Sequence, residues 1–157
     1  MGHRSSHRRG MSLLELIAVV TLMGVFAAVA IARLGPTVFG DIGSQTDARR
    51  VGLALLQAKR RAITAGNNHG VLFQNDGGGK LTYSVVSIDP FGSTSLVDGP
   101  FSFSQNVTAT VSQSTMSFTF EGQASASYTV DLVGPHKSWR ISVVPISGAL
   151  STVQTAP

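Results

Sequence analysis

The 157-residue chain contains no cysteine, so the sequence provides neither a disulfide framework nor a thiolate metal site. Beyond its first ten residues, the chain also has little net charge. Arg4, Arg8 and Arg9 account for three of the 12 basic residues, and beyond them nine basic residues face eight acidic ones. A chain this close to neutral is a poor candidate for a protein held to nucleic acid mainly by its charge.

Motifs for catalysis are also missing. Two of the four histidines lie in the first ten residues, and His69 and His136 are isolated, without the spacing of metal ligands. No serine lies in a Gly-x-Ser-x-Gly turn. The glycines at 77–79 are not followed by the Lys-Ser/Thr of a phosphate-binding loop, and Asp76 lacks the second acid of a calcium loop. We therefore expect a protein that is not an enzyme and binds no cofactor or metal.

What the chain does have is a long apolar run at residues 11–32. Its 22 residues include one charge, Glu15, and a basic leader, residues 1–10, precedes it. At about 1.5 Å of helical rise per residue the run reaches roughly 33 Å, which is enough to cross the hydrocarbon core of a bilayer. The leader predicts a cytoplasmic N-terminus and export of the C-terminal part by the positive-inside rule.

Glu15 is the unusual residue of this run, since a carboxylate in an apolar helix costs about 3 kcal/mol at the bilayer centre and less near the interface. One interpretation is that Glu15 lies among hydrated headgroups. The other follows from a cut after Gly10, which would create an ammonium group on Met11. In a bundle of parallel helices, that group could neutralise the Glu15 of a neighbouring subunit.

The run has two other interpretations. An ordinary secretory signal could be cleaved near Ala28 and Ala30, but its apolar region is normally 7 to 15 residues long and contains no carboxylate. An uncut signal anchor carrying an unrelated ligand-binding domain is the second. In that case, replacing Glu15 would leave function intact.

The junction itself, RG followed by MSLLEL, resembles the class III signal of type IV pilins and type II secretion pseudopilins. The resemblance implies that a prepilin peptidase cleaves after Gly10 and N-methylates Met11, and it makes Glu15 the fifth residue of the mature chain. Met11 departs from the phenylalanine that is usual there, and the run lacks the proline that many major pilins have.

A second helix is predicted at residues 46–65. Apolar residues recur at helical spacing, and Thr46 and Gly66 are expected to cap the two ends. The apolar face is Val51, Leu55, Ala58 and Ala62, widened by Leu53, Leu56 and Ile63. Before this helix, Gly35-Pro36 predicts a kink or partial melting.

Four arginines form a stripe on the other side of this helix: Arg49, Arg50, Arg60 and Arg61. The stripe is either a solvated helix face or a contact for an anionic partner such as lipid headgroups or DNA. No aromatic residue lies among the arginines, so stacking on single-stranded bases has no support.

From residue 69 onward the pattern alternates with a period of two, which predicts short strands. Residues 71–73 and 81–86 flank a glycine-rich turn and predict a hairpin, and further strands are expected at 107–111, 116–120, 128–133 and 139–144. In the second of these, Phe118 and Phe120 are expected on one face. Residues 89–100 predict a loop, and the small polar residues after Gly148 predict a mobile tail.

Three later stretches resemble one subgroup of these proteins. Residues 55–63, 118–122 and 141–148 are similar to stretches of GspH/FimT-type minor pseudopilins and pilins. The implied fold is α+β and pilin-like, with a long N-terminal helix packed on an antiparallel β-sheet domain. The implied organisation is a leader at 1–10, a transmembrane and filament-core helix at 11–32, its amphipathic continuation at 33–66 and a β-rich domain at 67–157.

The implied function is that of a minor pseudopilin of a type II secretion system, a structural subunit that helps to initiate a filament or lies at its tip. The alternative is a minor type IV pilin for pilus assembly or DNA uptake. The implied partners are prepilin peptidase, other pilins or pseudopilins and an inner-membrane assembly platform, with DNA as a weaker candidate. The implied location is the inner membrane, with the C-terminal domain in the periplasm, and then a periplasmic pseudopilus.

Overall fold

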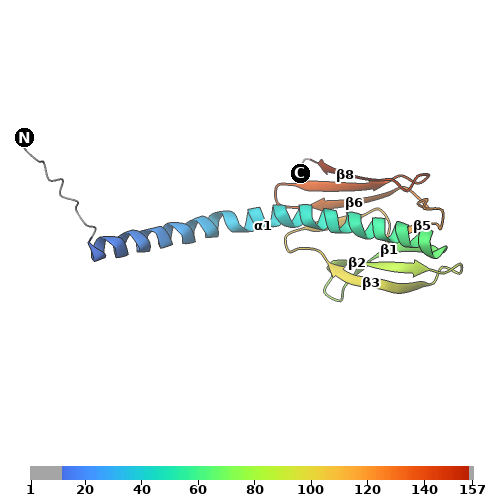
Figure 1. The fold of residues 1–157 in the computed structure, drawn as a ribbon, viewed down its shortest axis with the longest axis horizontal. Helices are drawn as coiled ribbons and strands as arrows, with labels where there is room; N and C mark the ends of the chain where they lie inside the picture. Colours follow the sequence, from blue (N-terminus) through green and yellow to red (C-terminus); the bar gives the residue numbers. More distant parts are fainter. Residues whose placement is uncertain (1–11, 156–157) are drawn as a thin grey trace, which may run out of the picture. The chain divides into compact units, whose positions relative to one another are not determined.

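The computed structural model describes residues 12–155 and, within them, every side chain except those of residues 34–40. The described residues form one long helix, α1 (Leu13–Ala65), followed by eight strands (Figure 1). The strands are β1 (Asn68–Asn75), β2 (Leu81–Ile88), β3 (Thr94–Ser102), β4 (Thr108–Val111), β5 (Thr115–Phe118), β6 (Tyr128–Val133), β7 (Ser138–Val143) and β8 (Leu150–Thr155). The chain divides into two compact units between Pro36 and Thr37.

The first unit is the apolar part of α1. Its stretch Leu13–Arg33 has 21 residues and a mean hydropathy of 2.5, and none of it is buried within the protein. Thr21, the polar residue in the middle of this stretch, bonds its hydroxyl to the carbonyls of Ile17 and Ala18, each at 2.9 Å. By length and composition, this stretch is long and apolar enough to cross a membrane, and the Thr21 hydroxyl is satisfied within the helix.

Helix α1 continues through Gly35-Pro36, so the predicted partial melting at this pair is wrong, whereas the alternative of a kink stays a prediction. Proline inside a helix removes one N–H donor and its ring crowds the carbonyl four residues earlier, which bends a helix that it does not break. The predicted cap at Thr46 is also wrong, because Thr46 lies inside the helix. The predicted end is confirmed: Gly66 has φ 67° and donates its N–H to the carbonyl of Ala62 at 3.1 Å.

The second unit places the later part of α1 on two antiparallel four-stranded sheets. One sheet has the order β3-β2-β1-β5 and the other β4-β6-β7-β8. In Figure 1, β2 and β3 lie on one side of this part of α1, and β6 and β8 lie on the other. The expected α+β architecture, a long N-terminal helix packed on antiparallel sheets, is therefore confirmed.

Apolar residues from all three layers meet in one core. From α1, Val51, Leu55, Ala58 and Ala62 are fully buried, as their helical spacing predicted. They pack against side chains from both sheets, namely Val71, Phe73, Tyr83, Val85, Met116, Phe118, Tyr128, Val130, Leu132, Ile141 and Val143. Because α1 and both sheets contribute to this core, the helix and the two sheets share one apolar interior.

Two segments predicted to be irregular are strands. Strand β3 pairs with β2 over most of the predicted loop 89–100, and β8 pairs with β7 from Leu150 to Thr155, where a mobile tail was expected. Both are edge strands. An edge strand tolerates proline and needs little apolar pattern, because tertiary pairing supplies its stability.

The predicted strand 116–120 starts one residue late and runs two residues past the end of the observed strand. Strand β5 ends at Phe118, which is fully buried, whereas Phe120 is 56% exposed in the following turn. Gly122, with φ 82°, closes that turn by donating its N–H to the Thr119 carbonyl. The two phenylalanines therefore do not share a face.

Candidate assembly and docking site

The predicted processing site, Gly10 and Met11, lies outside the described residues. Glu15 is described, in the first turn of α1, where its side chain is exposed. Ser12 precedes this turn and accepts a hydrogen bond from the N–H of Leu14 at 3.3 Å. The pairing of Glu15 with the amine of a neighbouring subunit stays a prediction.

The arginine stripe, Arg49, Arg50, Arg60 and Arg61, is exposed along its whole length. Leu53 lies among these arginines and is 65% exposed, and Ile63 is 51% exposed. The prediction that Leu53 and Ile63 widen the buried face is therefore wrong. At about 100° per residue, Leu53 lies nearly opposite the core residues.

An apolar groove runs beside Leu53, between α1 and the end of the second sheet. This groove, here called the β8 groove, has a volume of about 790 Å³. It is lined by Gln45, Ala48, Arg49, Gly52, Leu53, Leu56 and Lys59 from the helix, and by Trp139, Gly148, Ala149, Leu150 and Thr152 from the sheet side. Leu53 also borders a second hollow of about 520 Å³ near β3, which Arg50 and Phe101 line. The stripe is thus interrupted by apolar surface on both sides of Leu53.

Three charged residues of α1 tie loops of the β domain to the helix. Asp41 accepts the N–H of His136 at 2.9 Å, and Asp47, which is 1% exposed, accepts the N–H of Ser104 at 2.7 Å. The sequence reasoning missed both. Their partners lie 95 and 57 residues away along the chain, so no local pattern marks them.

Lys59 forms the third tie. Its ammonium donates to the carbonyls of Ser147 and Gly148, at 2.9 and 3.1 Å, and so holds the β7–β8 turn against the helix. Charge-assisted bonds of this kind hold a loop more firmly than neutral ones.

Replacing Lys59 by methionine keeps the alkyl chain and removes these donors. We expect Lys59→Met to lower the free energy of unfolding by about 1–2 kcal/mol. Urea denaturation followed by the fluorescence of Trp139, the single tryptophan, would measure the change. Lys137→Met, at an exposed lysine of the β6–β7 turn, is the control and should change the stability by less than about 0.5 kcal/mol. Equal effects of the two variants would show that the hydrogen bonds of Lys59 do not stabilise the fold.

Tyr83 lies under the helix beside Asp47 and Arg50. Burial raises the pKa of the Tyr83 hydroxyl above 10.0; the Asp47 charge acts in the same direction, and the Arg50 charge opposes it. Since the folded pKa is above the unfolded one, the contribution of Tyr83 to stability is complete below pH 10. It is lost as the pH rises through the folded-state pKa.

We therefore expect the urea midpoint of the native chain to fall more steeply above pH 10 than that of Tyr83→Phe. Phenylalanine has no proton to lose at this position. Urea titrations of both chains at pH 8 and at closely spaced values above pH 10 would measure the two slopes. Parallel slopes would show that Tyr83 does not contribute to the alkaline loss of stability.

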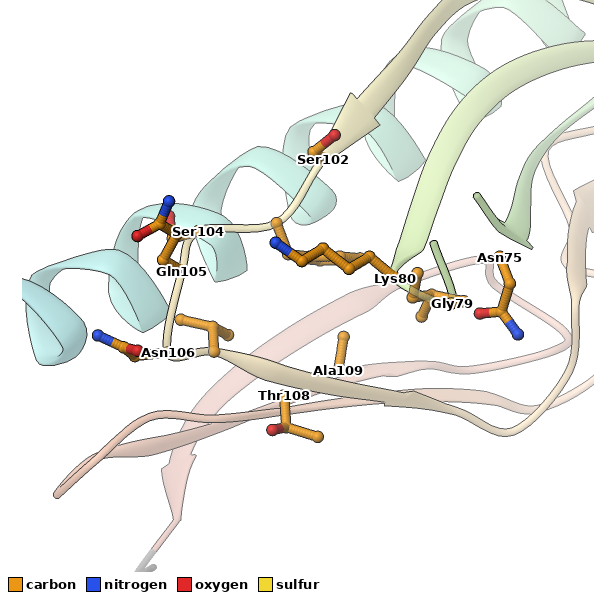
Figure 2. Close-up of a pocket in the computed structure, with 12 residues that line it drawn as sticks. Asn75, Gly79, Lys80, Ser102, Ser104, Gln105, Asn106, Thr108 and Ala109 are labelled. Atoms are coloured by element: carbon orange, nitrogen blue, oxygen red, sulfur yellow. The ribbon is translucent and has the colours of Figure 1, made fainter. Parts of the chain in front are cut away.

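A polar pocket lies at the end of the first sheet, between the β1–β2 turn and the segment that links β3 to β4. Its volume is about 560 Å³. Figure 2 shows the Lys80 side chain extending from the turn toward the segment that carries Ser104 and Gln105. The lining residues are Asn75, Gly79, Lys80, Leu81, Ser102, Phe103, Ser104, Gln105, Asn106, Val107, Thr108 and Ala109. Lys80 is the ionisable side chain of this lining, which contains no carboxylate or imidazole.

The two histidines in the described part of the chain lie in structural positions. His69 is 6% exposed, and its Nδ1 is 3.3 Å from the carbonyl of Asn67. His136 is exposed, and its backbone N–H is held by Asp41. Within residues 12–155, no group of three or more histidines and acids is placed to hold a metal ion.

Known proteins share two features with this chain. Residues 5–31 match the prokaryotic N-terminal methylation motif. The fold is similar to that of the type IV minor pilin FimU of Pseudomonas aeruginosa, with a TM-score of 0.58 at 18% identity over 72% of this chain and 91% of FimU. It is also similar to that of the minor pseudopilin EpsH from the type 2 secretion system of Vibrio cholerae, with a TM-score of 0.52 at 14% identity over 73% of this chain and 95% of EpsH. No curated protein matches the chain in sequence.

The fold of this chain, with a long N-terminal helix packed on antiparallel sheets, is thus similar to the folds of this minor pilin and this minor pseudopilin. It is joined here to the N-terminal methylation motif, which overlaps the start of the apolar helix.

Proposed function

We propose that the protein is a minor pseudopilin of a type II secretion system, a structural filament subunit that helps to start the pseudopilus or lies at its tip. The observation that carries this proposal is the methylation motif at residues 5–31, followed by an apolar helix and a pilin-like domain. The likeness to the minor pseudopilin EpsH supports the secretion assignment.

Processing is the first step of this function. Prepilin peptidase cleaves after Gly10 and methylates the amine of Met11, while the apolar helix anchors the subunit in the inner membrane with the β domain in the periplasm. During assembly, Glu15 pairs with the amine of a neighbouring subunit. The pairing sets the register of adjacent helices, because an unpaired carboxylate in an apolar bundle is costly.

A minor type IV pilin is the second candidate. The fold is somewhat more similar to FimU than to EpsH, with TM-scores of 0.58 and 0.52. Both candidates share the processing step and the assembly of subunits on an inner-membrane platform. They differ in the filament that incorporates the subunit.

Intact-mass measurement tests the processing step. The full chain is expressed with and without a prepilin peptidase, and the peptidase should remove residues 1–10 and add one methyl group. Glu15→Gln should be processed normally and yet be recovered much less in sedimented filaments. A chain that stays full length with an active peptidase present would overturn the proposal.

Deletion of the gene separates the two candidates. Loss of protein secretion with normal surface pili supports the pseudopilin, and loss of pili with normal secretion supports the minor pilin. Each defect should be reversed by the native chain but not by a chain with a blocked cleavage site.

A further inference from the structure

We propose that the arginine stripe and the β8 groove form one docking surface for an acidic, amphipathic segment of a neighbouring filament subunit. The inference rests on the proposed function only in naming the partner as a filament subunit. The acidic and amphipathic character of the segment is inferred from the basic and apolar groups of the surface itself. Apolar side chains of the segment fill the groove, and its carboxylates bind the arginines.

The floor of this surface is apolar and open to solvent. Leu53 is 65% exposed, and the groove beside it is lined by Leu56, Trp139 and Leu150. A volume of about 790 Å³ admits several side chains of another protein. Exposed apolar surface of this kind, bordered by polar groups, is typical of protein contact sites.

The border of the surface carries charge that the described chain does not neutralise. From residue 48 to residue 65 the helix contains five basic residues and no acid. Lys59 is held by two carbonyls, and the four arginines are exposed. Within residues 12–155, the ion pair that occurs is the distant one between Arg140 and Asp131. Since arginine binds carboxylates in paired hydrogen bonds, an acidic partner is complementary to the border.

Apolar and basic groups alternate on a single helix face, which favours one segment as the partner. Arg49, Leu53 and Arg60 fall within about 40° of one another at 100° per residue. The 11 residue steps from Arg49 to Arg60 rise roughly 16 Å, or about three helical turns. A partner helix or strand of that length can contact both arginines and cover Leu53.

The same surface is poorly suited to nucleic acid. Phosphates placed on the arginines would lie against Leu53 and a groove whose lining is mainly apolar, which is unfavourable for a charged group. Carboxylates on an apolar segment satisfy both parts of the surface.

Photocross-linking of the full chain in its own cells tests the proposal. Benzoylphenylalanine replaces Leu53 in one strain and Leu96 in a control strain, because Leu96 is similarly exposed, at 63%, on β3. We expect an adduct from position 53 that peptide mapping places in a segment of another subunit with at least two acids within two turns. Position 96 should give little of this adduct.

Charge reversal then tests the chemistry. Arg49→Glu with Arg60→Glu should lower the yield of the adduct about tenfold, and Lys137→Glu should leave it unchanged. Reversal of the mapped acids of the partner to arginine should restore the yield. If the double variant does not accumulate, Arg49→Gln with Arg60→Gln should still lower the yield about threefold.

Several results would overturn the inference: equal adducts from positions 53 and 96, a nuclease-sensitive or lipid adduct, a mapped segment without acids, or a yield that charge reversal does not change. Intact mass is measured on the same samples. Normal removal of residues 1–10 together with any of these results rejects the docking surface and leaves the proposed function standing. An unprocessed chain rejects the proposed function instead.

Discussion

Gly148→Ala is expected to lower the free energy of unfolding by about 2–4 kcal/mol, combining backbone strain at positive φ with steric overlap. Gly148 has φ 55° and is buried where the β7–β8 turn meets the turn that follows β5. A Cβ atom here would overlap the backbone carbonyl oxygen of Gly122, which no rotamer change can move away. The loss would be measured as a lower urea midpoint, with Trp139 as the fluorescent reporter.

Two other glycines separate the causes of this loss. Gly79 also has a positive φ, 78°, but a Cβ there has no neighbour within 4 Å, so Gly79→Ala should cost only about 1 kcal/mol. Gly77 has neither feature, and Gly77→Ala should be close to neutral. A loss at Gly148 no larger than that at Gly79 would show that the two turns move apart easily.

Asp47→Ala is expected to cost about 2–3 kcal/mol, because it removes a charged acceptor and leaves the N–H of Ser104 without its partner. The 2.7 Å bond from Ser104 fixes the segment that carries the chain from β3 in one sheet to β4 in the other. Loosening this segment should affect both sheets, so a single cooperative transition at lower urea concentration is the expected form of the loss.

Asp47→Asn is the matched control for this bond. Asparagine has nearly the same shape and can still accept the Ser104 N–H through its side-chain oxygen, so it should retain most of the stability. If Asp47→Asn and Asp47→Ala were equally destabilising, the negative charge would matter and the hydrogen bond would not. If both variants were as stable as the native chain, the hydrogen bond between Asp47 and Ser104 would make no contribution to stability.

The elements that could be predicted from the sequence have local causes. The apolar helix follows from its length, the buried face at Val51 and Leu55 from helical spacing, and strand β6 from alternation that matches its bounds, Tyr128–Val133. The hairpin of β1 and β2 follows from its glycine-rich turn, where Asp76 accepts the N–H groups of Gly78 and Lys80.

The elements that could not be predicted depend on partners far along the chain. Strand β3 contains Gly99-Pro100, which marks a loop in a sequence but is tolerated at the edge of a sheet. Strand β8 has small polar residues and is stabilised by pairing with β7.

The candidate site likewise has one part that the sequence predicted and one part that it did not. Helical spacing predicted the arginine stripe, because its members share one face. The β8 groove was missed because it forms only where Gly148 to Thr152 meet the helix, about 90 residues beyond it in the chain. Leu53 was assigned to the wrong side, because an apolar residue near a buried face looks the same in a sequence whether it is covered or left open.

The ties made by Asp41 and Lys59 also bear on the lifetime of the folded domain. Each closes a loop of about 90 residues, 95 for the bond to His136 and 88 for the bond to Ser147. Contacts that close such long loops carry a high entropy cost, so we expect them to form after the rate-limiting step of folding. Weakening them should therefore speed unfolding and leave the folding rate almost unchanged. The bonds of Asp41 and Lys59 would then govern how long the domain stays folded rather than how quickly it folds.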